Sequence, residues 1–202
     1  MKFQYEIPCI ERKQEAIDFV NEFYEYGSEI NGVGGLKRYL NNYEGWLQLL
    51  KEAETRELTE EKVPSRTYFL VRCEDNRIVG MANIRTKLNQ KMMQFGGNIG
   101  YSIRPTERKK GYNKINLYLA LKVCSEYGIA TALLDADADN IASWKTMEAL
   151  GGCLLREESV ENHKMIKFYT IDVEKSLKEY RSVYEPLIKN EIAMNKDDSV
   201  EL

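Results

Sequence analysis

The stretch Ile103 to Lys114 reads IRPTERKKGYNK and separates a strand-forming segment from one with helical spacing. Such a turn exposes several backbone N–H groups in one direction, at the positive end of the helix dipole. Gly111 allows a tight turn and a close approach of a ligand to the backbone. The three basic residues at 108–110 add positive charge beside it. The stretch favours a pyrophosphate ligand, although a solvated basic turn has the same composition.

This turn matches neither of two familiar nucleotide-binding patterns. The Walker A pattern G-x-x-x-x-G-K-[ST] and the dinucleotide-binding pattern G-x-G-x-x-G are both absent. An enzyme that acts on nucleotide phosphates would also need carboxylates in a metal-binding pattern. We therefore prefer a different phosphate-containing ligand.

Periodic apolar spacing on both sides of the turn predicts an α/β fold in which a mixed sheet is packed with helices. The order of strands and helices after Pro105 predicts parallel pairing in that part. The polar segment 89–94 is expected to be a link without regular structure. The predicted strands span 2–7, 67–73, 78–88, 95–103, 131–134, 152–158 and 164–173. The predicted helices span 10–26, 36–50, 113–127 and 139–150, with Asp139 or Asn140 as the N-cap of the last and Gly151 after its end.

The C-terminal part, residues 174–202, has helical spacing that Pro186 interrupts, which predicts two short helices. Residues 195–202 are expected to be disordered. We separate this extension from a domain spanning residues 1–173. Three roles are open for it: packing on the domain, a contact in a homodimer, or a cover over a substrate mouth.

The turn and its surroundings resemble the GNAT family of acyl-CoA-dependent N-acetyltransferases. The segment RKKGYN, residues 108–113, resembles the family signature R/Q-x-x-G-x-G/A. GGNIGYSIRPTERKKGY and DADNIASWKTMEALGG are similar to a bacterial subgroup of predicted acetyltransferases, and the resemblance covers roughly residues 3–173. It implies a mostly antiparallel central sheet, splayed between the strand ending at Ile103 and the strand ending near Leu134, with helices on both faces.

The resemblance also implies acetyl-CoA as the cofactor and assigns residues to it. Amides of the Arg108-to-Asn113 turn would cradle the pyrophosphate, and the pantetheine would pair with backbone near Tyr101 and Ile103. Asn140 and Ser143 match positions that contact the cofactor arm. The implied cofactor-binding residues are Tyr101, Ile103, Arg108, Lys109, Lys110, Gly111, Tyr112, Asn113, Asn140 and Ser143.

Three residues depart from the family pattern. Asn113 stands where the signature has Gly or Ala, and Asn98 stands where the subgroup has histidine. Met147 occupies the position, seven residues after Asn140, where many relatives place a tyrosine general acid. A catalytic role is therefore assigned elsewhere. Asp135 and Asp137, at the carboxyl end of a strand, could bind an ammonium or drain its proton, and Tyr101 is a further candidate.

Alternate aspartates at Asp135, Asp137 and Asp139 begin like an EF-hand loop. That loop needs glycine at its sixth position and glutamate at its twelfth, where this chain has Asn140 and Thr146. A single histidine, His163, in a polar stretch between apolar runs, predicts an exposed hairpin residue and excludes multi-histidine zinc sites. We therefore expect no metal.

Composition limits the partners. The 202 residues carry a net charge of −3, which implies no broad basic face and no nucleic-acid partner. No signal-like or membrane-spanning apolar run is present, and four cysteines without C-x-x-C spacing suit a reducing compartment, so we expect a cytoplasmic protein. Two functions remain: an acetyl-CoA-dependent N-acetyltransferase in which a small-molecule primary amine attacks directly, or a non-catalytic acetyl-CoA-binding sensor.

Overall fold

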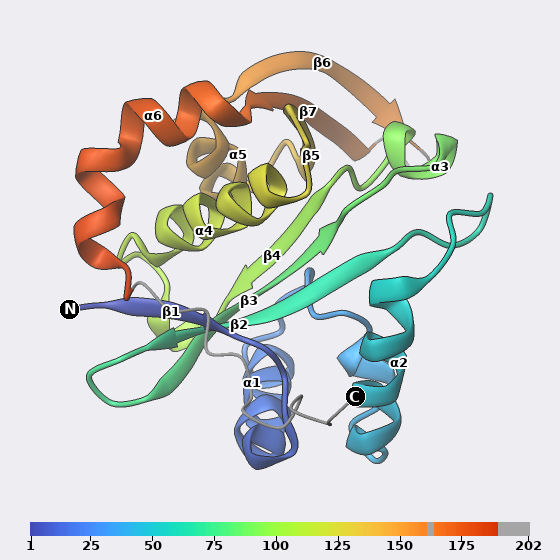
Figure 1. Cartoon of the computed structure of the whole chain (residues 1–202), viewed down its shortest axis with the longest axis vertical. Helices are drawn as coiled ribbons and strands as arrows, with labels where there is room; N and C mark the ends of the chain where they lie inside the picture. Colours follow the sequence, from blue (N-terminus) through green and yellow to red (C-terminus); the bar gives the residue numbers. More distant parts are fainter. Residues whose placement is uncertain (161–163, 190–202) are drawn as a thin grey trace, which may run out of the picture.

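Two antiparallel sheets adjoin in the computed structural model, which describes residues 1–160 and 164–189 (Figure 1). The first sheet has the order β1–β2–β3–β4. Its central strands are buried along almost their whole length because helices cover both faces. The strands are β1 (Phe3–Glu6), β2 (Ser65–Arg72), β3 (Arg77–Arg85) and β4 (Ile99–Ile103).

The second sheet has the order β5–β7–β6, and both of its pairings are antiparallel. Its strands are β5 (Thr131–Asp137), β6 (Cys153–Val160) and β7 (Lys164–Asp172). The prediction of parallel pairing after Pro105 is therefore wrong for these strands. Apolar runs predict that a strand forms but not which strand becomes its neighbour, and β5 pairs with β7, the last strand that the structure describes.

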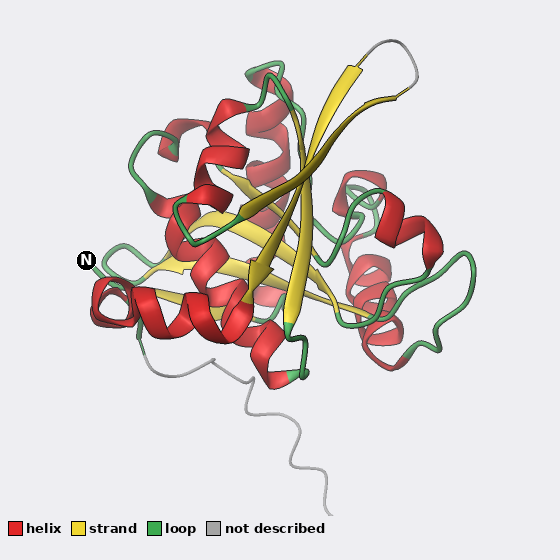
Figure 2. Cartoon of the chain, turned by 90° about the horizontal axis from the view of Figure 1, so that it is seen from above, coloured by secondary structure: helices red, strands yellow, loops and turns green. Residues whose placement is uncertain are grey.

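Helices cover both faces of the first sheet, as Figure 2 shows. On one face, α1 (Lys13–Glu25) and α2 (Tyr43–Thr55) bury aromatic side chains such as Phe19 and Trp46 against Phe69. On the other face, α4 (Tyr112–Glu126) packs its apolar residues against Leu70 and Ala82. The predicted GNAT-type arrangement of a mostly antiparallel sheet between helices is confirmed.

Side-chain caps explain where several helices begin. The Asn42 side chain accepts from the Gly45 amide at 3.1 Å, so α2 starts at Tyr43 and the predicted helix at 36–50 begins too early. Asn89 likewise caps a short helix, α3 (Gln90–Gln94), in the segment predicted to be irregular. Asn140 caps α5 (Ile141–Glu148), as one of the two predicted alternatives.

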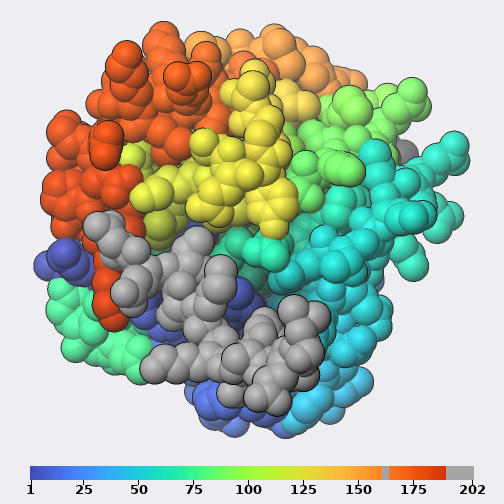
Figure 3. All heavy atoms as spheres, in the orientation of Figure 1, coloured from blue at the N-terminus to red at the C-terminus, as the bar shows by residue number. Residues whose placement is uncertain are grey.

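The last described helix, α6 (Val173–Tyr184), packs against α4. The rings of Tyr118 and Tyr184 lie 5.2 Å apart. A 3-10 turn, Glu185–Leu187, follows α6, and Ile188 forms a bridge with Phe3, so the second helix predicted after Pro186 does not include Ile188. Figure 3 shows α6 in red-orange beside the yellow residues at the end of α4.

The predictions for His163 and for the disordered end at 195–202 lie outside the described residues. Among the helices that the structure describes, none combines the length and apolar character needed to cross a bilayer.

Candidate functional site

A cleft of about 740 Å³ opens between β4 and β5. Its volume falls in the range of small-molecule and cofactor sites. Every residue to which the sequence assigned a site role lines it, except Lys110 and Tyr112. Lys110 instead donates to Glu107 at 2.8 Å, and Tyr112 is buried with its ring 4.8 Å from Phe3.

The cleft begins where β4 and β5 separate. At the vertex the Asn98 amide donates to the Leu133 carbonyl at 2.7 Å. Beyond it the two strands belong to different sheets, and β5 is paired with β7 instead. The splay therefore leaves one edge of β4 without a neighbour among the described strands.

The register identifies the backbone groups on that edge. The Asn98 carbonyl accepts from the Arg85 amide, and the Arg104 amide donates to the Val79 carbonyl, so these two groups face β3. Backbone groups alternate in direction along a strand. Those of Ile99, Tyr101 and Ile103 therefore face away from β3, on the side of the cleft.

The basic turn lies at the wide end of the cleft. Two of its residues have backbone angles in the left-handed region. Lys109 has φ +63° and Gly111 has φ +81°. The amides of residues 109–113 make no backbone hydrogen bond among the described residues, and no side chain caps α4 at Gly111. Left-handed residues in a turn gather N–H groups into an anion-binding concavity, which the helix dipole reinforces.

Two buried carboxylates hold this turn from behind. Glu107, 3% exposed, accepts from Arg72 at 2.7 Å and from Lys110. Glu22 accepts from the Thr106 amide at 2.7 Å and from Arg104 at 3.0 Å. Burial opposes the ionisation of both carboxyls, but their hydrogen bonds outweigh it and hold each pKa below its usual value. The basic charge of Lys110 is thus used to fix the turn.

A polar cluster joins the starts of α4 and α5 across the cleft floor. The Tyr101 hydroxyl lies 3.0 Å from Ser143 Oγ. The Thr146 hydroxyl donates to Ala142 and receives a long hydrogen bond of 3.4 Å from Asn113. Burial raises the pKa of Tyr101 well above its usual value despite these hydrogen bonds. Tyr101 therefore keeps its proton throughout the neutral range.

Asp135 and Asp137 both line the cleft but have different partners. Asp135 accepts from the Gly96 amide at 2.5 Å. Asp137 lies 2.7 Å from the ammonium of Lys164. Each carboxylate is thus paired with a neighbouring chain segment while remaining on the cleft wall. β5 continues to Asp137, beyond its predicted end at Leu134, because it pairs with β7 as far as Ile166.

The loop between α1 and α2 forms the opposite wall. Asn31 and Ser102 exchange two hydrogen bonds, of 2.6 and 2.9 Å. Gly32 packs so closely that a Cβ there would meet the Gly100 backbone at 2.3 Å. Glycine is needed at both 32 and 100 because the loop crosses the backbone of β4 in direct contact. This contact brings Ser28 and Glu29 to the cleft.

Several cleft residues were not predicted from the sequence. Most of them come from segments far from the recognised motifs and carry no local pattern that marks them, whereas Thr146 lies within the segment DADNIASWKTMEALGG. These residues include Ser28, Glu29, Asn31, Gly32, Arg85, Thr146, Lys164 and Ile166. Met147, at the expected tyrosine position, is 1% exposed and belongs to the main core.

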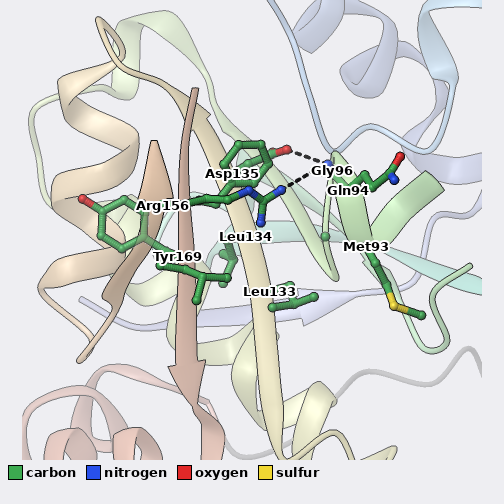
Figure 4. A pocket seen from close by; sticks show the side chains of 11 residues that line it. Met93, Gln94, Gly96, Leu133, Leu134, Asp135, Arg156 and Tyr169 are labelled. Atoms are coloured by element: carbon green, nitrogen blue, oxygen red, sulfur yellow. Dashed lines mark hydrogen bonds between the residues drawn. The ribbon is translucent and has the colours of Figure 1, made fainter. Parts of the chain in front are cut away.

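A second, much smaller cavity of about 40 Å³ lies beyond Asp135, under α3 (Figure 4). Gly96 and Asp135 line both cavities, so their hydrogen bond lies between the two. The Arg156 guanidinium stacks 3.8 Å from the centre of the Phe168 ring and donates to the Gln94 carbonyl.

In residues 1–160 and 164–189, no three His, Cys, Asp or Glu side chains are placed to hold a metal ion.

Comparisons with known proteins agree with this geometry. The acetyltransferase (GNAT) family model matches residues 22–152. No curated protein matches the chain. The spermidine/spermine N-acetyltransferase SpeG of Vibrio cholerae superposes with a TM-score of 0.60 at 12% identity, covering 88% of this chain and 99% of that one.

Two further structures share the fold. The ribosomal-protein-S5-alanine acetyltransferase of Vibrio fischeri has a TM-score of 0.62 at 11% identity, covering 85% of this chain and 94% of its own. A GNAT-family acetyltransferase of Bacillus anthracis has a TM-score of 0.56 at 13% identity, with coverages of 86% and 96%. Since the family model spans well over half of the 202 residues, the chain belongs to the acetyltransferase (GNAT) family.

Proposed function

We propose that the chain transfers the acetyl group of acetyl-CoA to the primary amine of a small molecule by direct attack. One observation carries this proposal: Lys109, Gly111 and Asn113, whose amides make no backbone hydrogen bond among the described residues, line the same cleft as the free edge of β4. Convergent N–H groups suit a pyrophosphate, and a free strand edge suits the amide groups of a pantetheine arm.

The cleft residues suit acetyl-CoA in their chemical type and in their order along the cleft. The turn amides would hold the pyrophosphate, with Arg108 and Lys109 beside it. The backbone of Tyr101 and Ile103 would pair with the pantetheine, and Asn140 and Ser143 would contact it from the start of α5. Bound there, acetyl-CoA would supply an acyl group activated as a thioester.

Side chains of the protein would then bind the amine and remove its proton. An ammonium must lose a proton before its nitrogen can attack a carbonyl. Asp135 and Asp137 are the carboxylates proposed to bind the ammonium and to drain its proton, directly or through water. Tyr101 is proposed as a hydroxyl that donates a hydrogen bond to the departing thiolate, because its raised pKa keeps the proton on its oxygen.

The second candidate function is acetyl-CoA binding without transfer. It is favoured by Met147, which is buried in the core and puts no acid group at the position where many relatives have tyrosine. In this reading Tyr101 positions the cofactor arm through Ser143 and does no proton transfer.

Calorimetry with acetyl-CoA and a thiol-release assay across a panel of primary amines separate these functions. Amine-dependent thiol release, with the acetylated amine identified by mass, is the expected result. Binding without release on any amine would support the second function, and absence of binding would overturn both.

We also propose that residues 1–173 form the catalytic domain and that residues 174–202 are an extension of it. The contact of α6 with α4 supports a packing role for the described part of this extension.

A further inference from the structure

The ammonium of Lys164 lies inside the cleft, on the wall formed by β5 and β7. Its Nζ is 2.7 Å from Asp137 Oδ2 and 4.0 Å from Glu29 Oε1. All three residues line the cleft. The two carboxylates come from different parts of the chain, since Asp137 ends β5 and Glu29 belongs to the loop before α2. The lysine thus bridges the two walls.

The charges at this end of the cleft favour cations. Two carboxylates, Asp137 and Glu29, face one ammonium, and Asp139 adds negative charge nearby. The Lys164 side chain is 45% exposed, so its ion pair is open to solvent and to competing ions. The lysine stem can swing into water without leaving a buried charge unpaired.

We infer that Lys164 occupies the position of the acceptor's ammonium and that the acceptor, an amine with net positive charge, displaces it from Asp137. This inference rests on the proposed function and names the acceptor's charge class. In the opposite arrangement, Lys164 binds a carboxylate on a zwitterionic acceptor. Loss of the lysine charge would then raise KM for that acceptor.

Three primary amines of equal chain length distinguish these arrangements: 1,4-diaminobutane, n-butylamine and 4-aminobutanoate. Thiol release would be measured for the wild type and for Lys164→Gln with each amine. Removing the internal competitor should lower KM for 1,4-diaminobutane about threefold, the scale of a weak exposed ion pair, and leave KM for acetyl-CoA unchanged.

Lys167→Gln is the matched control. Lys167 lies on the same strand but pairs with Glu157 at 2.7 Å and does not line the cleft. It should leave all three KM values unchanged. Asp137→Asn should raise KM for 1,4-diaminobutane, because it removes the carboxylate for which lysine and acceptor compete.

An unchanged or raised KM for 1,4-diaminobutane in Lys164→Gln would overturn the inference, as would a raised KM for 4-aminobutanoate alone. Failure of the proposed function looks different, since wild-type protein would then release no thiol with any amine. Retained wild-type turnover with an unresponsive Lys164→Gln variant contradicts the inference only.

Discussion

Asn98 and Leu133 exchange two hydrogen bonds at the vertex of the cleft. The Asn98 amide donates to the Leu133 carbonyl at 2.7 Å, and the Leu133 amide donates to Asn98 Oδ1 at 2.9 Å. Asn98 Nδ2 also donates to the Arg85 carbonyl on β3, at 3.1 Å. One side chain therefore joins β3 and β5 where β4 leaves β5. Its role in this chain is to fix the separation of the strands.

Replacing Asn98 by alanine should destabilise the protein by about 2–4 kcal/mol, because two partly buried backbone groups, on Arg85 and Leu133, lose their partners. Urea unfolding followed by circular dichroism measures the change. Asn21→Ala, at an exposed position of α1, is the control and should alter the free energy of unfolding by less than about 0.5 kcal/mol. Equal stabilities of the two variants would contradict this role for Asn98.

Gly111→Ala should weaken acetyl-CoA binding. A Cβ at Gly111 meets no atom within 4 Å, so the change acts through its φ of +81° and strains the turn that presents the amides. Gly128→Ala provides a matched control: φ is +68°, no atom lies within 4 Å, and the residue follows the other end of α4. Both variants should lose about 1 kcal/mol of stability.

Calorimetry then separates the two glycines. Only Gly111→Ala should bind acetyl-CoA about tenfold more weakly than the wild type. Equal binding by the two variants would show that the geometry of the turn does not matter to the cofactor.

Asp135→Asn isolates charge from structure, because an asparagine oxygen can still accept from the Gly96 amide. The free energy of unfolding should stay within about 1 kcal/mol of wild type, while kcat/KM for the amine should fall at least about tenfold. Asp18→Asn, on the exposed side of α1, should change neither value. A fully active Asp135→Asn variant would remove Asp135 from the proposed mechanism.

Acid should unfold the protein partly through Glu107. Its folded pKa lies below the usual carboxyl value, so the ionised form stabilises the folded state above that value. This stability should be lost as pH falls below about 4.5, through the depressed pKa of the folded state. Glu107→Gln should cost about 3 kcal/mol at pH 7 and less at acidic pH.

Unfolding free energies measured at several pH values test this sign. A difference between Glu107→Gln and wild type that grows toward low pH would contradict the assignment.

Much of the architecture could be predicted from residues alone because the apolar period specifies local structure. The turn at Gly111 and the α5 cap at Asn140 follow from local rules, and the structure confirms both. Gly151 has the left-handed conformation expected after a helix, but α5 ends at Glu148, two residues before its predicted end. Short α3 was missed because its five residues carry no apolar period. The pairing of β5 with β7 was missed because these strands lie far apart in sequence, and no local sequence pattern indicates which strands pair.

The candidate site likewise contains residues that local sequence patterns predict and residues that they do not. The turn residues and the alternate aspartates stand in recognisable order along the chain, and most of them line one cleft. Glu29 and Lys164 reach that cleft only through the docking of a loop and a β-hairpin, so no local spacing predicts them. Lys110 shows the converse: its charge suggests a phosphate contact, yet its ammonium is paired with buried Glu107.

Amide hydrogen exchange with and without acetyl-CoA tests the central claim most directly, because it reports on the backbone groups that the proposal assigns to the cofactor. Peptides covering residues 99–103 and 109–113 should exchange more slowly when acetyl-CoA is added, while peptides from α2 should be unchanged. Exchange at residues 109–113 that stays the same at saturating acetyl-CoA would contradict the account.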